Sequence, residues 1–104
     1  QGYDDNYVLD NKEEVDAVVY STISGRKMEV ITDEPGMQFY SGQGGAQWKR
    51  AIDNGQPTTN ARSSFALETQ HYPDSPNQPS FPSTTLEPGK DYKSKTIYRF
   101  SVMK

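Results

Sequence analysis

The stretch SSFALETQHYPDSPNQPSFPS, residues 63–83, joins an alternating segment to a dense run of prolines. Phe65 and Leu67 fall on one alternate face of the first part. Glu68 and Gln70 fall on the other. Because successive side chains of a strand point to opposite faces, this pattern predicts a half-buried β-strand. Four prolines then follow within ten residues. Each fixes its own φ, so they predict a long connection that holds one shape.

Strand and turn signals continue on both sides of this stretch. We expect strands at residues 7–10, 16–23, 28–32, 37–41, 63–70 and 93–103. Turn signals separate them at SGRK (24–27), DEPG (33–36) and EPG (87–89). Residues 42–62 read as a polar, glycine-bearing loop with one candidate helical turn at 47–52. Short alternating strands between frequent turns indicate an antiparallel all-β fold, and a β-sandwich is the favoured architecture.

The composition describes a chain with a small core of its own. Among 104 residues, Leu, Ile, Val and Phe together number 17, below the roughly 20% at which a chain begins to look unable to fold alone. The net charge is only −3 and aromatic residues make up 12%, so the sequence does not have the signature of disorder. We therefore expect a fragment whose core is completed by residues outside this chain.

The charge and the residue types also limit the classes of function. A net charge of −3 argues against a nucleic-acid surface, which needs clustered Lys and Arg. No apolar run reaches the length of a membrane-spanning helix, so we expect no membrane partner. The chain contains no cysteine, which excludes disulfides and thiolate chemistry but leaves the compartment open.

Glu68 is the strongest candidate for chemistry. An isolated glutamate on a strand is most often an outward, solvated residue. Here, however, Gln70 shares its face, and a carboxylate beside an amide suits a hydroxyl-rich ligand. His71 is the only histidine, and no second ligand lies at metal spacing. We interpret His71 as packed beneath the proline loop, and we predict no metal site.

Two other stretches carry weaker signals. GYDDNYVLD (2–10) offers Asp4, Asp5 and Asn6 ahead of a predicted strand, where such residues cap or turn the backbone or present side chains to a sugar. Gln38 lies between Met37 and Phe39. Its amide is either an exposed alternate residue or a polar group in a pocket walled by aromatic rings, and the sequence leaves both open.

Three stretches together resemble one family. GYDDNYVLD, GRKMEVITDEPGMQFYSG and FALETQHYPDSPNQPSFPSTTLEPGKDY, closed by TIYRFSV, are similar in order and spacing to the C-terminal portion of the aldose 1-epimerase (galactose mutarotase) family. The resemblance covers nearly the whole chain, and LETQHYPDSPNQP is its most specific part. It implies a larger antiparallel β-sandwich, the galactose mutarotase-like supersandwich. Residues 1–104 would be the C-terminal fragment of that single domain.

The resemblance also implies a reaction and its residues. Such a protein interconverts the α- and β-anomers of free aldohexoses such as galactose or glucose, without a metal or organic cofactor. Glu68 matches the general base on the anomeric hydroxyl, and Asp4 and Gln38 match residues that bind substrate hydroxyls. A general base needs a pKa near the working pH, which partial burial of a carboxylate would favour.

Some features depart from the family pattern or fall outside this chain. The acid of the family is a histidine upstream of these motifs, and His71 does not match it. Asp5 stands where the family commonly carries histidine. We therefore expect the fragment alone to be inactive, with its apolar faces covered by an N-terminal part of the same protein or by another chain.

Two alternatives to an enzyme remain open at this level. One is a non-catalytic carbohydrate-binding β-sandwich, and the other is a purely structural sandwich domain, for which the joint presence of Glu68, Gln38 and Asp4 would be unexplained. The expected location is the cytoplasm, or the periplasm or cell exterior if an upstream segment carries a signal.

Overall fold

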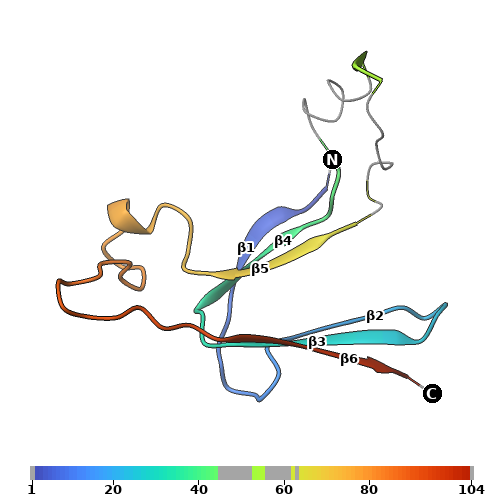
Figure 1. Ribbon diagram of the computed structural model, residues 1–104, viewed down its shortest axis with the longest axis horizontal. Helices are drawn as coiled ribbons and strands as arrows, with labels where there is room; N and C mark the ends of the chain where they lie inside the picture. The colour runs from blue at the N-terminus through green and yellow to red at the C-terminus, as the bar shows by residue number, and fades with distance from the viewer. Residues whose placement is uncertain (1, 45–52, 56–61, 63, 104) are drawn as a thin grey trace.

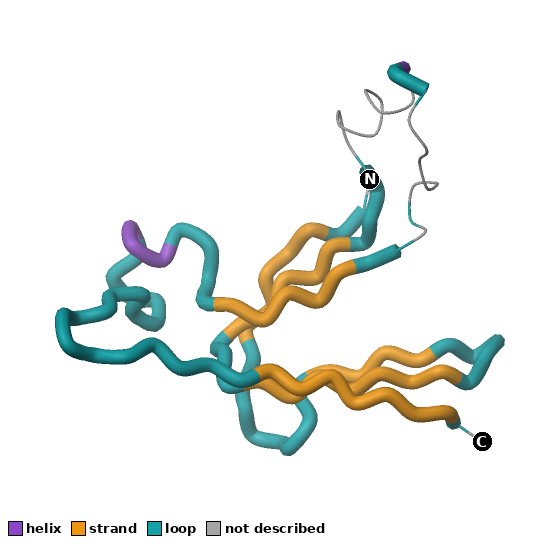
Figure 2. Tube along the Cα trace, in the orientation of Figure 1, coloured by secondary structure: helices purple, strands orange, loops and turns teal. Residues whose placement is uncertain are grey.

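The computed structural model describes residues 2–44, 53–55, 62 and 64–103. Its strands are β1 (Asp4–Val8), β2 (Ala17–Tyr20), β3 (Arg26–Thr32), β4 (Gly36–Tyr40), β5 (Ala66–Gln70) and β6 (Thr96–Val102). A 3-10 turn, η1 (Ser75–Asn77), lies between β5 and β6 (Figure 2). All strand pairs are antiparallel, and they form two three-stranded sheets in the orders β1-β4-β5 and β2-β3-β6. The all-β, antiparallel sandwich class predicted from the sequence is confirmed.

The two sheets meet at one end and diverge toward the other (Figure 1). Where they meet, the hydroxyls of Thr32, Thr96 and Thr69 form a hydrogen-bonded chain with steps of 2.9 and 2.7 Å. The Tyr98 hydroxyl also donates to the Leu67 carbonyl at 3.1 Å. The β3–β4 turn and the long β5–β6 connection carry the chain from one sheet to the other at this end, so the junction fixes the two sheets relative to each other.

Alternation along the strands gives each sheet an apolar inner face. Met28 pairs with Phe100 and Val30 with Tyr98 across β3 and β6, and Val30 is fully buried. On the opposite face of the same pair, Arg99 Nε donates to Glu29 Oε2 at 2.9 Å. Met28 and Val30 thus share one face of β3, and Glu29 lies on the other. The hydrogen bond from Arg99, followed by that from Lys27, holds the pKa of Glu29 below its usual value.

The strand boundaries differ from the prediction most clearly at the N-terminus. The sequence predicts a strand at 7–10, with Asp4 and Asn6 ahead of it. In the structure, β1 begins at Asp4 and pairs with β4 from Asp4↔Tyr40 to Val8↔Gly36. The prediction was wrong because β1 is mostly exposed, so its polar residues resemble a turn while the neighbouring strand supplies the hydrogen bonds.

The proline-rich connection makes several contacts within itself. Asp74, at the N-cap position of η1, adopts a left-handed conformation with φ of 63°. Its carboxylate accepts from Asn77 Nδ2 at 2.6 Å and from Gln78 Nε2 at 2.9 Å. The bond from Gln78, then that from Asn77, lowers the pKa of Asp74. The rings of Tyr72 and Phe81 meet edge to face, with centroids 5.2 Å apart, and close the loop on itself.

The predicted turns at Gly25 and at 87–89 are present. Gly25 has φ of +71°, and the Ser21 carbonyl accepts its amide at 2.8 Å within the β2–β3 hairpin. Glycine is needed there because a Cβ would also come within 2.9 Å of the Met103 carbonyl oxygen. In the second turn, the Lys90 amide donates to the Glu87 carbonyl at 3.1 Å. The candidate helical turn at 47–52 lies outside the described residues.

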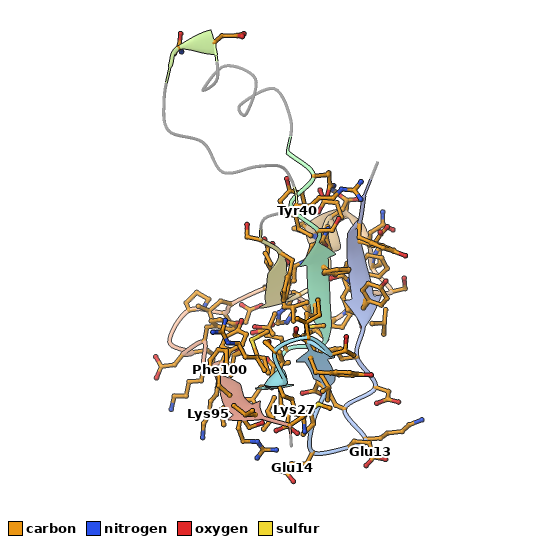
Figure 3. All side chains as sticks on the ribbon, turned by 90° about the vertical axis from the view of Figure 1, so that its right-hand side faces the viewer. Glu13, Glu14, Lys27, Tyr40, Lys95 and Phe100 are labelled. Atoms are coloured by element: carbon orange, nitrogen blue, oxygen red, sulfur yellow. The ribbon has the colours of Figure 1, made fainter. Side chains whose placement is uncertain are left out.

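Few large apolar side chains of the described residues are fully covered. Val30 and Met37 are the buried hydrophobic residues, whereas Phe100 is 73% and Val102 68% exposed. Figure 3 shows Phe100 at the surface of the β2-β3-β6 sheet. Between the sheets lies an open cavity of about 470 Å³, whose lining includes Met37, Phe39 and Leu67. No helix in the described part of the chain is long and apolar enough to cross a membrane.

Candidate active site

The polar residues singled out in the sequence meet on the outer face of the β1-β4-β5 sheet. Asn6 pairs with Gln38, and Gln38 pairs with Glu68, so these residues form one row across three strands. Asp4 and Gln70 lie two residues away from this row on the same alternate face. The opposite face carries Met37, Phe39 and Leu67 toward the second sheet. The fold thus brings Asp4, Gln38 and Glu68 together.

Hydrogen bonds connect most of this polar face. Gln38 Nε2 donates to Asp4 Oδ1 at 3.0 Å. Gln70 Nε2 donates to Gln38 Oε1 at 3.1 Å and to Asn6 Oδ1 at 3.1 Å. The carboxylate and amides are therefore held in a network before any ligand arrives, and such pre-organisation reduces the ordering cost of binding. From the sequence, Asn6 either caps or turns the backbone or presents its side chain to a sugar, and the strand register places it on this polar face.

Glu68 is exposed, and it stands directly opposite Gln38 on the polar face. The described residues therefore do not give Glu68 the partial burial that would suit a general base. The reason is positional, because β5 is an edge strand of the described sheet and Glu68 points to its outer side. A carboxylate in this place is accessible to a ligand that lies across the row.

One end of the polar face is shaped by Gly36 and the proline-rich connection. A Cβ at Gly36 would come within 2.8 Å of the Tyr72 ring and 2.9 Å of Asn6 Oδ1. The missing side chain lets the ring of Tyr72 and the amide of Asn6 approach the backbone of β4. The stiffened connection thereby contacts the site directly, through an aromatic ring placed next to the amides.

A second polar cluster lies behind the end of β5. His71 Nδ1 is 2.7 Å from Glu34 Oε2, and the Tyr92 hydroxyl donates to the other oxygen of the same carboxylate. Glu34 is only 5% exposed. His71 also lines a cavity of about 560 Å³ with residues 83–86, which follow the four prolines in the β5–β6 connection. The sequence does not single out Glu34, because the DEPG signal marks it only as part of a turn.

The environment of Glu34 favours its charged form. Burial raises the pKa of this carboxyl, but hydrogen bonds from Ser94, Tyr92 and His71 outweigh burial and leave the pKa of Glu34 below its ordinary value. The same contact with Glu34 raises the pKa of Tyr92. The cluster ties the β3–β4 turn to the end of β5, and so holds the two strands that carry Gln38 and Glu68.

We expect Glu34→Gln to destabilise the protein at neutral pH by about 1.5–3 kcal/mol, the range for hydrogen bonds to charged groups. Because the pKa of Glu34 is lowered on folding, its contribution is fully present above the ordinary carboxyl pKa and is lost as the pH falls through the lowered value. Wild-type protein should therefore lose more stability than Glu34→Gln on acidification below about pH 5.

Urea unfolding of the full-length protein that carries this chain, at several pH values, would measure this difference. Glu13→Gln is a suitable control, because Glu13 is exposed and projects from the loop between β1 and β2 (Figure 3). Equal acid sensitivity of wild type and Glu34→Gln would contradict a charged, hydrogen-bonded Glu34.

The fold and the polar face define a class: an antiparallel β-sandwich with a pre-formed cluster of carboxylates and amides suited to a hydroxyl-rich ligand. A family model described as aldose 1-epimerase matches residues 1–99. Galactose mutarotase from Homo sapiens is 42% identical over 108 residues, which cover 97% of this chain. Aldose 1-epimerase from Escherichia coli (strain K12) is 36% identical over 107 residues, which cover 96% of this chain. The chain spans about 30% of the length of these relatives. It belongs to the aldose 1-epimerase family.

Proposed function

We propose that the protein carrying this chain interconverts the α- and β-anomers of free aldohexoses such as galactose and glucose. One observation carries the proposal: Glu68 lies directly opposite Gln38, which is in turn hydrogen-bonded to Asp4 at 3.0 Å. A potential proton acceptor and two hydroxyl-binding side chains thus share one open face. Relatives of this chain named galactose mutarotase and aldose 1-epimerase support the same reaction class.

The proposed reaction consists of proton transfers around the sugar ring. Glu68 removes the proton from the C1 hydroxyl, an acid protonates the ring oxygen, and the bond between C1 and the ring oxygen breaks. The open-chain aldehyde rotates about the C1–C2 bond. Return of both protons closes the ring with C1 in the other configuration. Asp4 and Gln38 hold the remaining hydroxyls, so that the reacting atoms stay near Glu68.

The acid is proposed to come from outside this chain. In the resemblance it is a histidine upstream of the matched motifs, and His71 is engaged with Glu34 behind the end of β5. We propose that the part of the protein that carries this histidine also covers Glu68 and excludes water from the polar face. It would thereby supply the burial that a general base requires. We propose residues 1–104 as the C-terminal part of that single β-sandwich domain.

The exposed apolar residues support this completion. Phe100 and Val102 are mostly exposed on the inner alternate face of β6, and the cavity between the sheets is open. We propose that an N-terminal part of the same protein covers them; another chain could fill the same role. Apolar faces of this kind require a partner to be stable in water.

Polarimetry of freshly dissolved α-glucose and α-galactose tests the activity directly. The protein should speed the approach to the equilibrium rotation of at least one of these sugars. A non-catalytic sugar-binding sandwich is the other candidate, since the polar face could bind hydroxyls without Glu68 acting as a base. Sugar binding in calorimetry with no effect on the rate of mutarotation would favour that candidate.

Asp4→Asn and Gln38→Ala should each raise KM more than they lower kcat, because both residues are assigned to hydroxyl contacts and not to proton transfer. The loss of one such hydrogen bond corresponds to an increase of about tenfold in KM. Initial rates measured by polarimetry over a range of galactose concentrations would show it. An unchanged KM with a collapsed kcat in either variant would contradict the assigned role.

A further inference from the structure

We propose that Gln70 is a positioning residue that fixes the direction of the Gln38 amide, so that the sugar meets an N–H donor from Gln38 beside a carboxylate acceptor from Asp4. The inference rests on the proposed function and adds the residue that sets the pattern of donors and acceptors. Its evidence is the directed chain of hydrogen bonds from Gln70 to Gln38 and from Gln38 to Asp4.

The direction of this chain begins at Asp4. An ionised carboxylate only accepts hydrogen bonds, so the side chain of Gln38 must turn its Nε2 toward Asp4 Oδ1, which lies 3.0 Å away. The Oε1 of Gln38 then faces the other way. There it accepts from Gln70 Nε2 at 3.1 Å. A donor is required at position 70 for this orientation to be satisfied.

Gln70 serves two acceptors with the two hydrogens of one amide nitrogen. Besides Gln38 Oε1, Nε2 of Gln70 donates to Asn6 Oδ1 at 3.1 Å. The Gln70 side chain can extend to Asn6 because its partner on β4 is Gly36. A Cβ at Gly36 would come within 2.9 Å of Asn6 Oδ1. Gln70, on β5, is thereby hydrogen-bonded to side chains of both β1 and β4. It is half-buried and lies two residues beyond Glu68 on the same face.

The hydrogen-bond donors and acceptors that these side chains leave unused define what a ligand would contact. An amide nitrogen carries two hydrogens, and Gln38 uses one of them on Asp4, which leaves one for a ligand oxygen. Asn6 accepts through Oδ1, so its amide nitrogen can donate. Asp4 keeps its second oxygen as an acceptor. Neighbouring hydroxyls of an aldohexose fit this pattern, because one can donate to Asp4 while the next accepts from Gln38.

The test uses Gln70→Glu in the full-length protein, because glutamate keeps the shape of the side chain and replaces the donor by an acceptor. Gln38 would then face acceptors on both sides. We expect KM for galactose to rise on the order of tenfold, with kcat changed much less. Gln70→Met, which removes the donor without adding charge, should show a smaller rise in KM and serves as the matched control.

Combining Gln70→Glu with Asp4→Asn gives a measurement that would not change if Gln70 had only a general structural role. An asparagine at position 4 can donate, so in the double variant with Gln70→Glu the Gln38 amide can reverse and satisfy both neighbours. Thermal unfolding of the four proteins should then show that the two substitutions together cost less stability than the sum of the single effects. The resonance of the Gln38 side-chain amide in 15N-labelled protein should also shift in Gln70→Glu.

The possible outcomes separate the two hypotheses. Strictly additive unfolding effects, or a KM for Gln70→Glu within twofold of wild type, would overturn the role of Gln70. If the wild-type protein shows no mutarotation at all, the proposed function fails. The amide resonance and the unfolding cycle still decide the orientation of Gln38 in that case, and additivity there would overturn the positioning role.

Discussion

Glu68→Gln is expected to remove nearly all mutarotation from the full-length protein while leaving its fold intact. Glutamine preserves the shape of the side chain at the centre of the row but cannot accept a proton from the C1 hydroxyl. Loss of a general base costs on the order of a hundredfold or more in rate. Because Glu68 is exposed and forms no hydrogen bond with another described side chain, its replacement should barely change the free energy of unfolding.

Polarimetry with α-glucose and a thermal melt by circular dichroism would be measured on the same preparation. Glu87→Gln is the matched control, since Glu87 is an exposed residue in the turn at 87–90, away from the polar face. We expect wild-type rates for the control. Retention of more than about a tenth of the wild-type rate in Glu68→Gln would remove Glu68 from the role of base.

The parts of the fold that follow from local pattern could be predicted. The division of β5 into Leu67 on one face and Glu68 with Gln70 on the other depends only on the two-residue period of a strand. The turn at Gly25 could be read for a similar reason, since a positive φ there is nearly restricted to glycine. Each of these features involves residues close together in the sequence.

Features that depend on strand register could not be predicted in the same way. The row of Asn6, Gln38 and Glu68 arises from pairings between strands that lie 32 and 30 residues apart at this row. A shift of one residue in either pairing would place different faces together. Residue type and resemblance could therefore single out Gln38 and Glu68, but they could not show that Asn6 joins them.

The buried cluster behind the end of β5 could not be predicted either, because it also depends on residues far apart in the sequence. Glu34 is buried by partners that come from distant parts of the chain, His71 and Tyr92. In the sequence it stands between Asp33 and Pro35, a context typical of an exposed turn. Burial of a charged residue is a property of the assembled loops, and the local pattern gave no sign of it.

The second large effect concerns the 104-residue chain expressed by itself, which should show no mutarotation and no cooperative thermal transition as a monomer. Val30 and Met37 are the buried hydrophobic residues of the described part, whereas large side chains such as Phe100 remain mostly exposed. Full burial of a large apolar side chain contributes only about 1.5–3 kcal/mol, whereas ordering each residue costs about 1.5 kcal/mol. A core of this size therefore cannot stabilise the folded sandwich.

Chemistry leads to the same expectation independently of stability. Opening the ring needs a proton donor at the ring oxygen as well as a base at C1, and His71, the only histidine of the chain, is held by Glu34 at 2.7 Å behind the end of β5. Size-exclusion chromatography, circular dichroism melting and polarimetry of the chain beside the full-length protein would test both arguments. A monomer with a cooperative melt would contradict the argument from the core, and measurable mutarotation by that monomer would contradict the need for an acid from outside the chain.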